Sequence, residues 1–157
     1  MTKNLLKGFL LTAFMIVSLF AAESSAQTVS GSISNGTVPR GKTTRGVVRL
    51  SIPAGLHVNS SNPNSEYSIA TRVTLSANGI RLGAVNYPKG TDRKFQFSPN
   101  TINVYEGNVS FPFTVNVPAN YRGKTISVKA VVRFQACTEE VCYPPKNKEI
   151  TLTAKIR

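Results

Sequence analysis

The only two cysteines of the chain, Cys137 and Cys142, are separated by four residues and followed directly by Tyr143, Pro144 and Pro145. Two cysteines at this spacing can form a disulfide, but a ring of this size stabilises a fold weakly. In the chain-entropy model it restricts the unfolded state by only about 2 kcal/mol. Cross-links that serve stability usually join distant segments. The pair is therefore either a small staple on a hairpin or a redox centre.

Thiol–disulfide exchange needs a thiolate, an accessible sulfur and a second sulfur that resolves the mixed disulfide. The cysteine pair supplies both sulfurs. Glu139 and Glu140 lie between the cysteines and disfavour a thiolate, whereas Arg133 and Lys146 offset this effect if the fold brings them close. The sequence leaves open which sulfur attacks a partner, and an inert hairpin disulfide remains the alternative interpretation.

Other chemistries find little support in the remaining residues. The chain has no Cys-x-x-Cys pair, which argues against a thioredoxin-type active site. Two cysteines and the single histidine, His57, do not make the tetrahedral ligand set of a zinc site, so we predict no metal. We interpret His57 as a structural histidine and Asp92, the only aspartate, as a turn residue. We expect no cofactor and no small-molecule substrate.

The N-terminal residues have the organisation of a secretory signal peptide. Lys3 and Lys7 precede an uncharged apolar run over residues 8–20, and small residues at 24–26 suit cleavage after Ala26. A membrane anchor is the alternative, but the run is 13 residues long, and a span needs about 20. We therefore predict that residues 1–26 are a cleaved signal peptide and that the chain is exported to a compartment where disulfides persist.

The 131 residues from 27 to 157 are expected to form a single domain. A chain of this length buries a core without help from disulfides. Its net charge of +12 becomes +11 once residues 1–26 are removed. The export signal and the scattered positions of the basic residues argue against a nucleic-acid partner. The charge is interpreted as a solvated basic surface, with attraction to an acidic partner or an anionic envelope surface as the alternative.

Apolar and polar residues alternate along several segments, and no stretch has a convincing helical period, so we predict an all-β fold. Turn-forming clusters separate these segments, as is typical of an antiparallel β-sandwich. Pro112 cannot donate to a strand ladder, so its strand is expected at an edge or at a bulge. Residues 27–44 are expected to form a loosely held first strand. The clearest alternation covers residues 47–52, 69–75, 109–117, 126–136 and 150–156.

The same alternation indicates where Cys137 points. Val132 and Phe134 share the apolar face of their strand, whereas Cys137 has the phase of Lys129 and Arg133. If alternation continues to the end of the strand, the sulfur of Cys137 points away from the core. The pair then lies at one end of a hairpin, on the surface or under a loop. Exposure is what thiol exchange requires, so this phase favours an exchange role.

The cysteine segment resembles a known motif. Residues 135–137 (Gln-Ala-Cys) and 141–145 (Val-Cys-Tyr-Pro-Pro) are similar to the motif of the N-terminal periplasmic domain of DsbD, the thiol:disulfide interchange protein. Residues 55–59, 85–90 and 104–107 fall where that family carries similar segments. The likeness extends over about residues 46–153, which is most of the chain beyond the predicted signal peptide.

This resemblance implies an immunoglobulin-like antiparallel β-sandwich and a cysteine pair that cycles between dithiol and disulfide. In the family, the domain takes electrons from a thioredoxin-like domain fed through a membrane domain, and passes them to periplasmic thioredoxin-like proteins. A loop bearing a Phe shields the pair when no partner is bound. By position the shielding residue is Phe97, or alternatively Phe95. Tyr143 and Pro144 are expected in the wall of the site.

Members of the family continue into a membrane domain and a thioredoxin-like domain, whereas this chain ends soon after the motif. We therefore expect a separate periplasmic carrier that exchanges electrons through Cys137 and Cys142. Thioredoxin-like proteins are its expected donor and acceptor, and a membrane reductase is a further candidate donor. Tyrosines that flank the cysteines in some members are not matched at Leu56 and Val58. The alternative is a secreted immunoglobulin-like binding or assembly domain whose disulfide merely pins a hairpin.

Overall fold

The computed structural model describes residues 26–157, so the predicted signal peptide lies outside the described residues except for Ala26. The described part contains strands and turns, and no helix in it is long and apolar enough to cross a membrane. The strands are β1 (Thr28–Ile33), β2 (Thr37–Val38), β3 (Thr43–Ser51), β4 (His57–Asn59), β5 (Arg72–Ser76), β6 (Arg81–Leu82), β7 (Thr91–Lys94), β8 (Thr101–Tyr105), β9 (Asn108–Asn116), β10 (Thr125–Phe134), β11 (Ala136–Cys137) and β12 (Lys146–Ile156).

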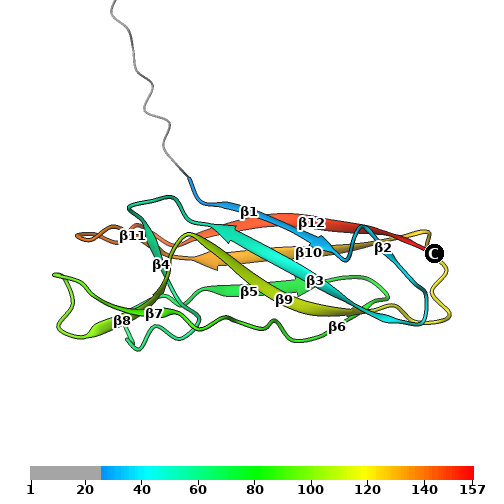
Figure 1. Ribbon diagram of the computed structural model, residues 1–157, viewed down its shortest axis with the longest axis horizontal. Helices are drawn as coiled ribbons and strands as arrows, with labels where there is room; N and C mark the ends of the chain where they lie inside the picture. Colours follow the sequence, from blue (N-terminus) through cyan, green and yellow to red (C-terminus); the bar gives the residue numbers. More distant parts are fainter. Residues whose placement is uncertain (1–25) are drawn as a thin grey trace, which may run out of the picture.

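The strands form three four-stranded sheets, and the two larger ones make a sandwich (Figure 1). The first sheet has the order β1-β3-β9-β6 and the second the order β2-β12-β10-β5. Every strand pair is antiparallel except β12 with β2, which is parallel. Alternate residues of the long strands are buried, as expected for two sheets that share one core. Fully buried side chains from both sheets meet there: Val48, Leu50, Phe111, Val115, Ile126, Val128, Ala130 and Val132.

The alternation in the sequence located most of the long strands. The segments expected at 47–52, 109–117 and 150–156 correspond to β3, β9 and β12, and the segment at 126–136 corresponds to β10 followed by β11. The expectation of a loosely held first strand is wrong. Six residues of β1 pair with β3, and Ile33 is fully buried in the core.

Pro112 sits on β9, which lies between β3 and β6 in the first sheet. β6 is only two residues long and pairs with β9 at residues 115–116, so it does not reach Pro112. The carbonyl of Pro112 instead accepts a hydrogen bond from the backbone N–H of Asn86, at 2.8 Å. The segment after β6 therefore lies beside β9 at Pro112 without forming a regular ladder, so the missing N–H of the proline costs no ladder bond there.

The third sheet has the order β11-β4-β8-β7 and lies at the end of the molecule away from the C-terminus (Figure 1). Its strands are two to five residues long, too short for a clear alternation in the sequence. Val58, Tyr105 and Ala136 on one face join the sandwich core. Phe95 and Ile102, with Val104, form a separate small cluster. This sheet thus caps the sandwich with one face and supports a second apolar cluster.

A test of the sandwich core is available at Gly46, which faces Phe113 across the β3–β9 ladder. A Cβ atom at Gly46 would lie 2.7 Å from ring atoms Cε1 and Cε2 of Phe113. Because Phe113 is buried in the core, the ring has little room to move. Gly46→Ala should therefore lower the free energy of unfolding by about 1–3 kcal/mol, measured by urea denaturation. Arg49→Ala, on the exposed side of the same strand, should change it by less than about 0.5 kcal/mol. Equal effects of the two substitutions would contradict this packing.

Candidate redox site

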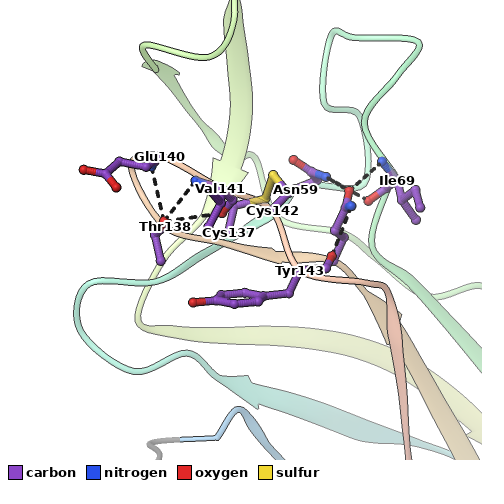
Figure 2. The surroundings of a disulfide bond; sticks show 9 residues. Asn59, Ile69, Cys137, Thr138, Glu140, Val141, Cys142 and Tyr143 are labelled. Carbon is purple, nitrogen blue, oxygen red and sulfur yellow. Dashed lines mark hydrogen bonds between the residues drawn. A yellow bond between two sulfur atoms is a disulfide. The ribbon is translucent and has the colours of Figure 1, made fainter.

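The two cysteines face each other across a short hairpin and form a disulfide, with their Cα atoms 4.0 Å apart (Figure 2). Two backbone hydrogen bonds of 2.8 Å bracket the disulfide. The N–H of Thr138 donates to the carbonyl of Val141, and the N–H of Tyr143 donates to the carbonyl of Ala136. The cysteines are therefore a directly opposed pair that does not exchange backbone hydrogen bonds, the arrangement in which opposed side chains approach most closely.

The turn between the cysteines is held by a side chain of its own. The hydroxyl oxygen of Thr138 accepts hydrogen bonds from the backbone N–H groups of Glu140 and Val141, at 3.2 and 3.1 Å. Hydroxyl-to-backbone contacts of this kind are typical of tight turns. The residues between the cysteines thus form a local turn that does not need the disulfide to define it.

Gln135 interrupts the strand just before the first cysteine, between the end of β10 and the start of β11. Its side-chain oxygen accepts hydrogen bonds from Nδ2 of Asn59, at 3.1 Å, and from the backbone N–H of Ile69, at 3.4 Å. Its side-chain nitrogen donates to the carbonyl of Tyr143, at 3.2 Å. Gln135 therefore fastens the cysteine hairpin to β4 and to the loop before β5.

The two sulfurs differ in burial. Cys137 is fully buried and Cys142 is exposed. The phase expected from alternation is consistent with the structure, because Ala136 packs into the sandwich core and Cys137 is not part of that core. We expected the pair on the surface or under a loop, and the structure leaves Cys142 exposed and buries Cys137. The physical reason is that β11 pairs with β4, whose His57 lies directly opposite Cys137. An attacking thiol therefore meets Cys142 first.

Two phenylalanine rings stack over His57, the residue opposite Cys137. The ring of Phe95, which follows β7, lies 4.2 Å from the ring of His57 at an interplanar angle of 15°. The ring of Phe97 stacks on Phe95 in turn, 5.2 Å away and at 9°. Phe95 is buried, whereas Phe97 is 40% exposed. The two shielding candidates therefore have different positions: Phe95 is the inner residue that covers His57, and Phe97 is the outer one.

An open pocket of about 560 Å³ adjoins the exposed cysteine. Cys142 and Gln135 line its inner side, and Phe97 belongs to a loop, residues 97–100, that lines another part. Residues 64–68 contribute a further part, with Tyr67 89% exposed. The structure thus brings Phe97 and Cys142, which are 45 positions apart in the sequence, to one concave surface.

Tyr143 and Pro144 occupy a different place. They line a separate pocket of about 210 Å³ together with Leu56 and Phe134, and neither cysteine lines that pocket. Tyr143 contributes to the hairpin through its backbone, while its side chain is 44% exposed. The structure therefore places these two residues next to the cysteine hairpin but outside the pocket that Cys142 lines.

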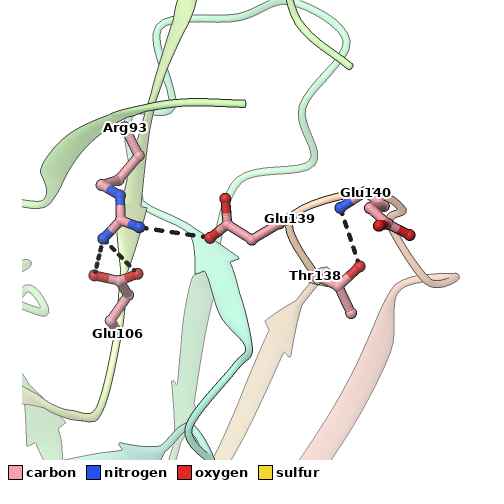
Figure 3. Close-up of polar contacts among 5 residues, drawn as sticks. All are labelled: Arg93, Glu106, Thr138, Glu139 and Glu140. Atoms are coloured by element: carbon pink, nitrogen blue, oxygen red, sulfur yellow. Dashed lines mark hydrogen bonds and ion pairs between the residues drawn. The ribbon is translucent and has the colours of Figure 1, made fainter. Parts of the chain in front are cut away.

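An arginine of β7 contacts the turn between the cysteines. Nη1 of Arg93 contacts both carboxylate oxygens of Glu106, at 3.0 and 3.1 Å, and Nη2 contacts Glu139 at 3.5 Å (Figure 3). These side chains are 40–66% exposed, so each pair contributes at most about 1 kcal/mol. Arg93 nevertheless links the strand that precedes Phe95 to the turn between the cysteines. No pattern in the sequence marks Arg93, since residues 91–94 contain no apolar residue.

His57 is almost fully buried, with 2% of its surface exposed. Burial lowers the pKa of its imidazole below the usual value, because the charged form loses its hydration. The carboxylates of Glu139 and Glu106 oppose this lowering of the pKa, and Arg93 adds to it. Asp92, expected in a turn, lies instead in β7, where its carboxylate accepts a hydrogen bond from Asn103 at 2.7 Å.

A β-sandwich that carries an exposed cysteine opposite a buried one, on a capping hairpin, has the fold and the pair of sulfurs that a thiol–disulfide exchange domain needs. The sequence profile of the family "Thiol:disulfide interchange protein DsbD, N-terminal" matches residues 29–154. The chain belongs to this family, and its fold is the immunoglobulin-like β-sandwich. No curated protein sequence gives a significant match.

Two solved structures are similar to this one. The N-terminal domain of DsbD from Neisseria meningitidis in the reduced form has 22% identity and a TM-score of 0.45, and the match covers 70% of this chain and 77% of that one. The N-terminal periplasmic domain of ScsB from Proteus mirabilis has 12% identity and a TM-score of 0.53, and the match covers 87% of this chain and 49% of that one. The chain therefore spans about half of that ScsB domain.

Membership of the family supports three general statements. The chain is a thiol–disulfide exchange domain, its homologues act in the periplasm, and domains of this family interact with thioredoxin-like proteins. The described part of the chain holds one disulfide, between Cys137 and Cys142, and no free cysteine.

The buried histidine makes stability depend on pH. His57 has a lower pKa in the folded protein than in the unfolded chain, so the unfolded chain binds more protons between the two values. The free energy of unfolding should therefore fall as the pH drops below about 6.5, and the whole loss is reached below the folded pKa. His57→Phe keeps an aromatic ring against Phe95 and should flatten this part of the curve. Urea denaturation of wild type and His57→Phe between about pH 5 and pH 7.5 measures this pH dependence. Parallel curves for the two proteins would show that His57 does not cause the loss of stability.

Proposed function

We propose that this protein is an exported thiol–disulfide exchange module that relays two electrons between thioredoxin-like partners through a reversible Cys137–Cys142 disulfide. The observation that carries the proposal is the unequal burial of the two sulfurs, one exposed at a pocket and one buried beside it. An exposed sulfur can form a mixed disulfide with a partner, and a buried sulfur opposite it can resolve that intermediate.

The geometry favours Cys142 as the sulfur that meets partners. During reduction, a donor thiolate attacks Sγ of Cys142, the bond to Cys137 breaks, and its electron pair stays on Sγ of Cys137. A second donor thiolate then attacks the donor sulfur of the mixed disulfide, which leaves Cys142 as a thiolate and the donor oxidised. During reduction of an acceptor, the Cys142 thiolate attacks the acceptor disulfide. Cys137 then attacks Sγ of Cys142 and releases the acceptor as a dithiol after protonation.

The pocket at Cys142 is the proposed docking surface for a thioredoxin-like partner. Its rim carries two exposed aromatic side chains, Tyr67 and Phe97, and exposed apolar groups are typical of interaction sites. Phe97 stands at the outer end of the stacked rings and lines the same pocket as Cys142, so we assign it the shielding role. Phe95 supports it from below. Tyr143 and Pro144 hold the hairpin from its other side.

We further propose that residues 27–157 act as one periplasmic domain after removal of a signal peptide over residues 1–26. The matched residues 29–154 fall inside this span, and the family's homologues support the compartment. A membrane reductase or a thioredoxin-like protein would supply the electrons. The basic charge suits an acidic donor or acceptor, or the anionic envelope surface.

The rival function is a binding or assembly domain with an inert disulfide. An inert disulfide is usually buried, which protects it from attacking thiols. It also usually joins distant segments, which increases its contribution to stability. Here one sulfur is exposed and the two cysteines are five positions apart in the sequence. Both observations favour exchange.

Trapping variants test the relay. Cys137→Ala should accumulate mixed disulfides with thioredoxin-like proteins in the envelope, because Cys142 can attack a partner and nothing resolves the product. Cys142→Ala should trap about tenfold less, since Cys137 is buried. Non-reducing electrophoresis followed by mass spectrometry measures both. The double substitution is the control for disulfides that form elsewhere.

Two outcomes would count against the relay. One is the absence of mixed disulfides with both single variants. The other is a reduction potential of the purified protein far below about −300 mV, which marks a structural disulfide. A potential near those of thioredoxin-like proteins of the envelope would support exchange.

The shielding role has its own test. Phe97→Ala should raise the rate at which dithiothreitol reduces the disulfide by about three- to tenfold. It should cost less than about 1 kcal/mol of stability, because the ring is already 40% exposed. Tyr67→Ala removes the other exposed ring at the same pocket and should leave the rate unchanged, since that ring is 89% exposed and covers little. A Phe97→Ala rate equal to wild type would assign the shielding elsewhere.

A further inference from the structure

We propose that His57 is the proton acceptor for Cys137 when this buried sulfur resolves the mixed disulfide. The inference rests on the proposed exchange function and assigns to His57 a chemical role beyond its packing. A buried thiol is a poor nucleophile, because burial away from water disfavours the thiolate. The resolving step therefore needs a group beside Cys137 that can take its proton.

The register of the third sheet puts His57 beside Cys137. The two residues are directly opposed across the antiparallel β4–β11 pair. Opposed residues project from the same face of a sheet, with Cβ atoms about 4.5–5.5 Å apart. Cys142 is opposed to Cys137 on the other side and forms the disulfide with it. Cys142, Cys137 and His57 thus make a row across three neighbouring segments, with the resolving sulfur in the middle.

The imidazole is shielded from water on the side away from the sheet. Phe95 stacks on it at 4.2 Å, and Phe97 covers Phe95. Both His57 and Cys137 are almost fully buried, so bulk water and hydroxide reach this thiol poorly. A proton leaving Cys137 in this enclosure has the neighbouring imidazole as its acceptor.

The charged groups around His57 come from three segments. Glu139 lies in the cysteine turn, Glu106 follows β8 and Arg93 lies on β7. Burial lowers the pKa of His57, so its imidazole is neutral around neutral pH and free to accept a proton. The two carboxylates favour the imidazolium that forms on proton transfer, and Arg93, itself paired with both carboxylates, opposes it.

The resolving step balances as follows. In the mixed disulfide, Cys142 is bonded to a partner sulfur and Cys137 is a thiol. The proton of Cys137 moves to the imidazole of His57 as Sγ of Cys137 attacks Sγ of Cys142. The bond between Cys142 and the partner breaks, and the partner sulfur leaves with the electron pair as a thiolate. The imidazolium then returns its proton to solvent or to the leaving thiolate.

The experiment follows the resolving step alone, with the reduced protein and 5,5′-dithiobis(2-nitrobenzoate) as the probe. Attack by Cys142 releases one coloured thiolate, and attack by Cys137 on the mixed disulfide releases the second. Stopped-flow absorbance separates the two phases, since only the first depends on probe concentration. The rate of the second phase is measured against pH for wild type, His57→Phe and Phe95→Leu. The last variant loosens the stack but keeps the imidazole.

In wild type the second phase should rise with pH through an inflection below about pH 6.5, as the imidazole loses its proton. His57→Phe should lose this inflection and resolve at least about tenfold more slowly at neutral pH, with a rate that follows hydroxide. Its first phase should stay within about twofold of wild type. Phe95→Leu should keep the inflection.

Three results would overturn the assignment of His57 as proton acceptor. The rate of the second phase in His57→Phe could follow pH in parallel with wild type, or Phe95→Leu could also lose the inflection. Equal slowing of both phases in His57→Phe would mark a purely structural role for His57. Failure of the exchange function is a distinct result. If wild type releases only one thiolate at every pH, Cys137 does not resolve the mixed disulfide at all, and the relay itself is wrong.

Discussion

The site depends on one interruption of a strand, at Gln135. Up to Phe134 the chain belongs to the second sheet of the sandwich, and from Ala136 it belongs to the third sheet. The side-chain amide of Gln135 accepts hydrogen bonds from the side chain of Asn59 and the N–H of Ile69 and donates to the carbonyl of Tyr143, so it ties the interruption to its neighbours. Because the chain changes sheets here, the cysteines lie on the capping sheet instead of on a long strand whose outward face is open to solvent.

The change of sheet creates the inequality between the two sulfurs. On a continuous edge strand, both cysteines of a hairpin would be similarly accessible. Pairing of β11 with β4 instead places His57 on one side of Cys137 and leaves Cys142 on the open side. The rings of Phe95 and Phe97 then cover the closed side. One local pairing thus separates a sulfur that can meet a partner from a sulfur that can only meet its neighbour.

The sequence predicted the sandwich well because its long strands alternate over nine or more residues, as in β3, β9 and β10. It predicted the cysteine pair because cysteine is rare and its spacing is informative. It did not predict the burial of Cys137, since that depends on β4, three residues long and buried throughout, which no alternation marks. Arg93 was also missed, because its contact with Glu139 joins segments 46 positions apart. His57 was interpreted as a structural histidine because its neighbours in sequence are apolar, and no pattern in the sequence indicated that Cys137 lies opposite it across the sheet.

The small size of the disulfide ring suits the proposed carrier role, which requires a domain that is stable in both redox states. Breaking it removes a restriction of only about 2 kcal/mol on the unfolded chain, while the apolar core shared by the two large sheets is untouched. The hairpin also keeps bonds that do not involve sulfur, from Thr138 within the turn and from Gln135 at its base. Reduction therefore frees two thiols that stay opposite each other. A pair held in place in this way can close again on a partner without refolding of the domain, which is what repeated exchange demands.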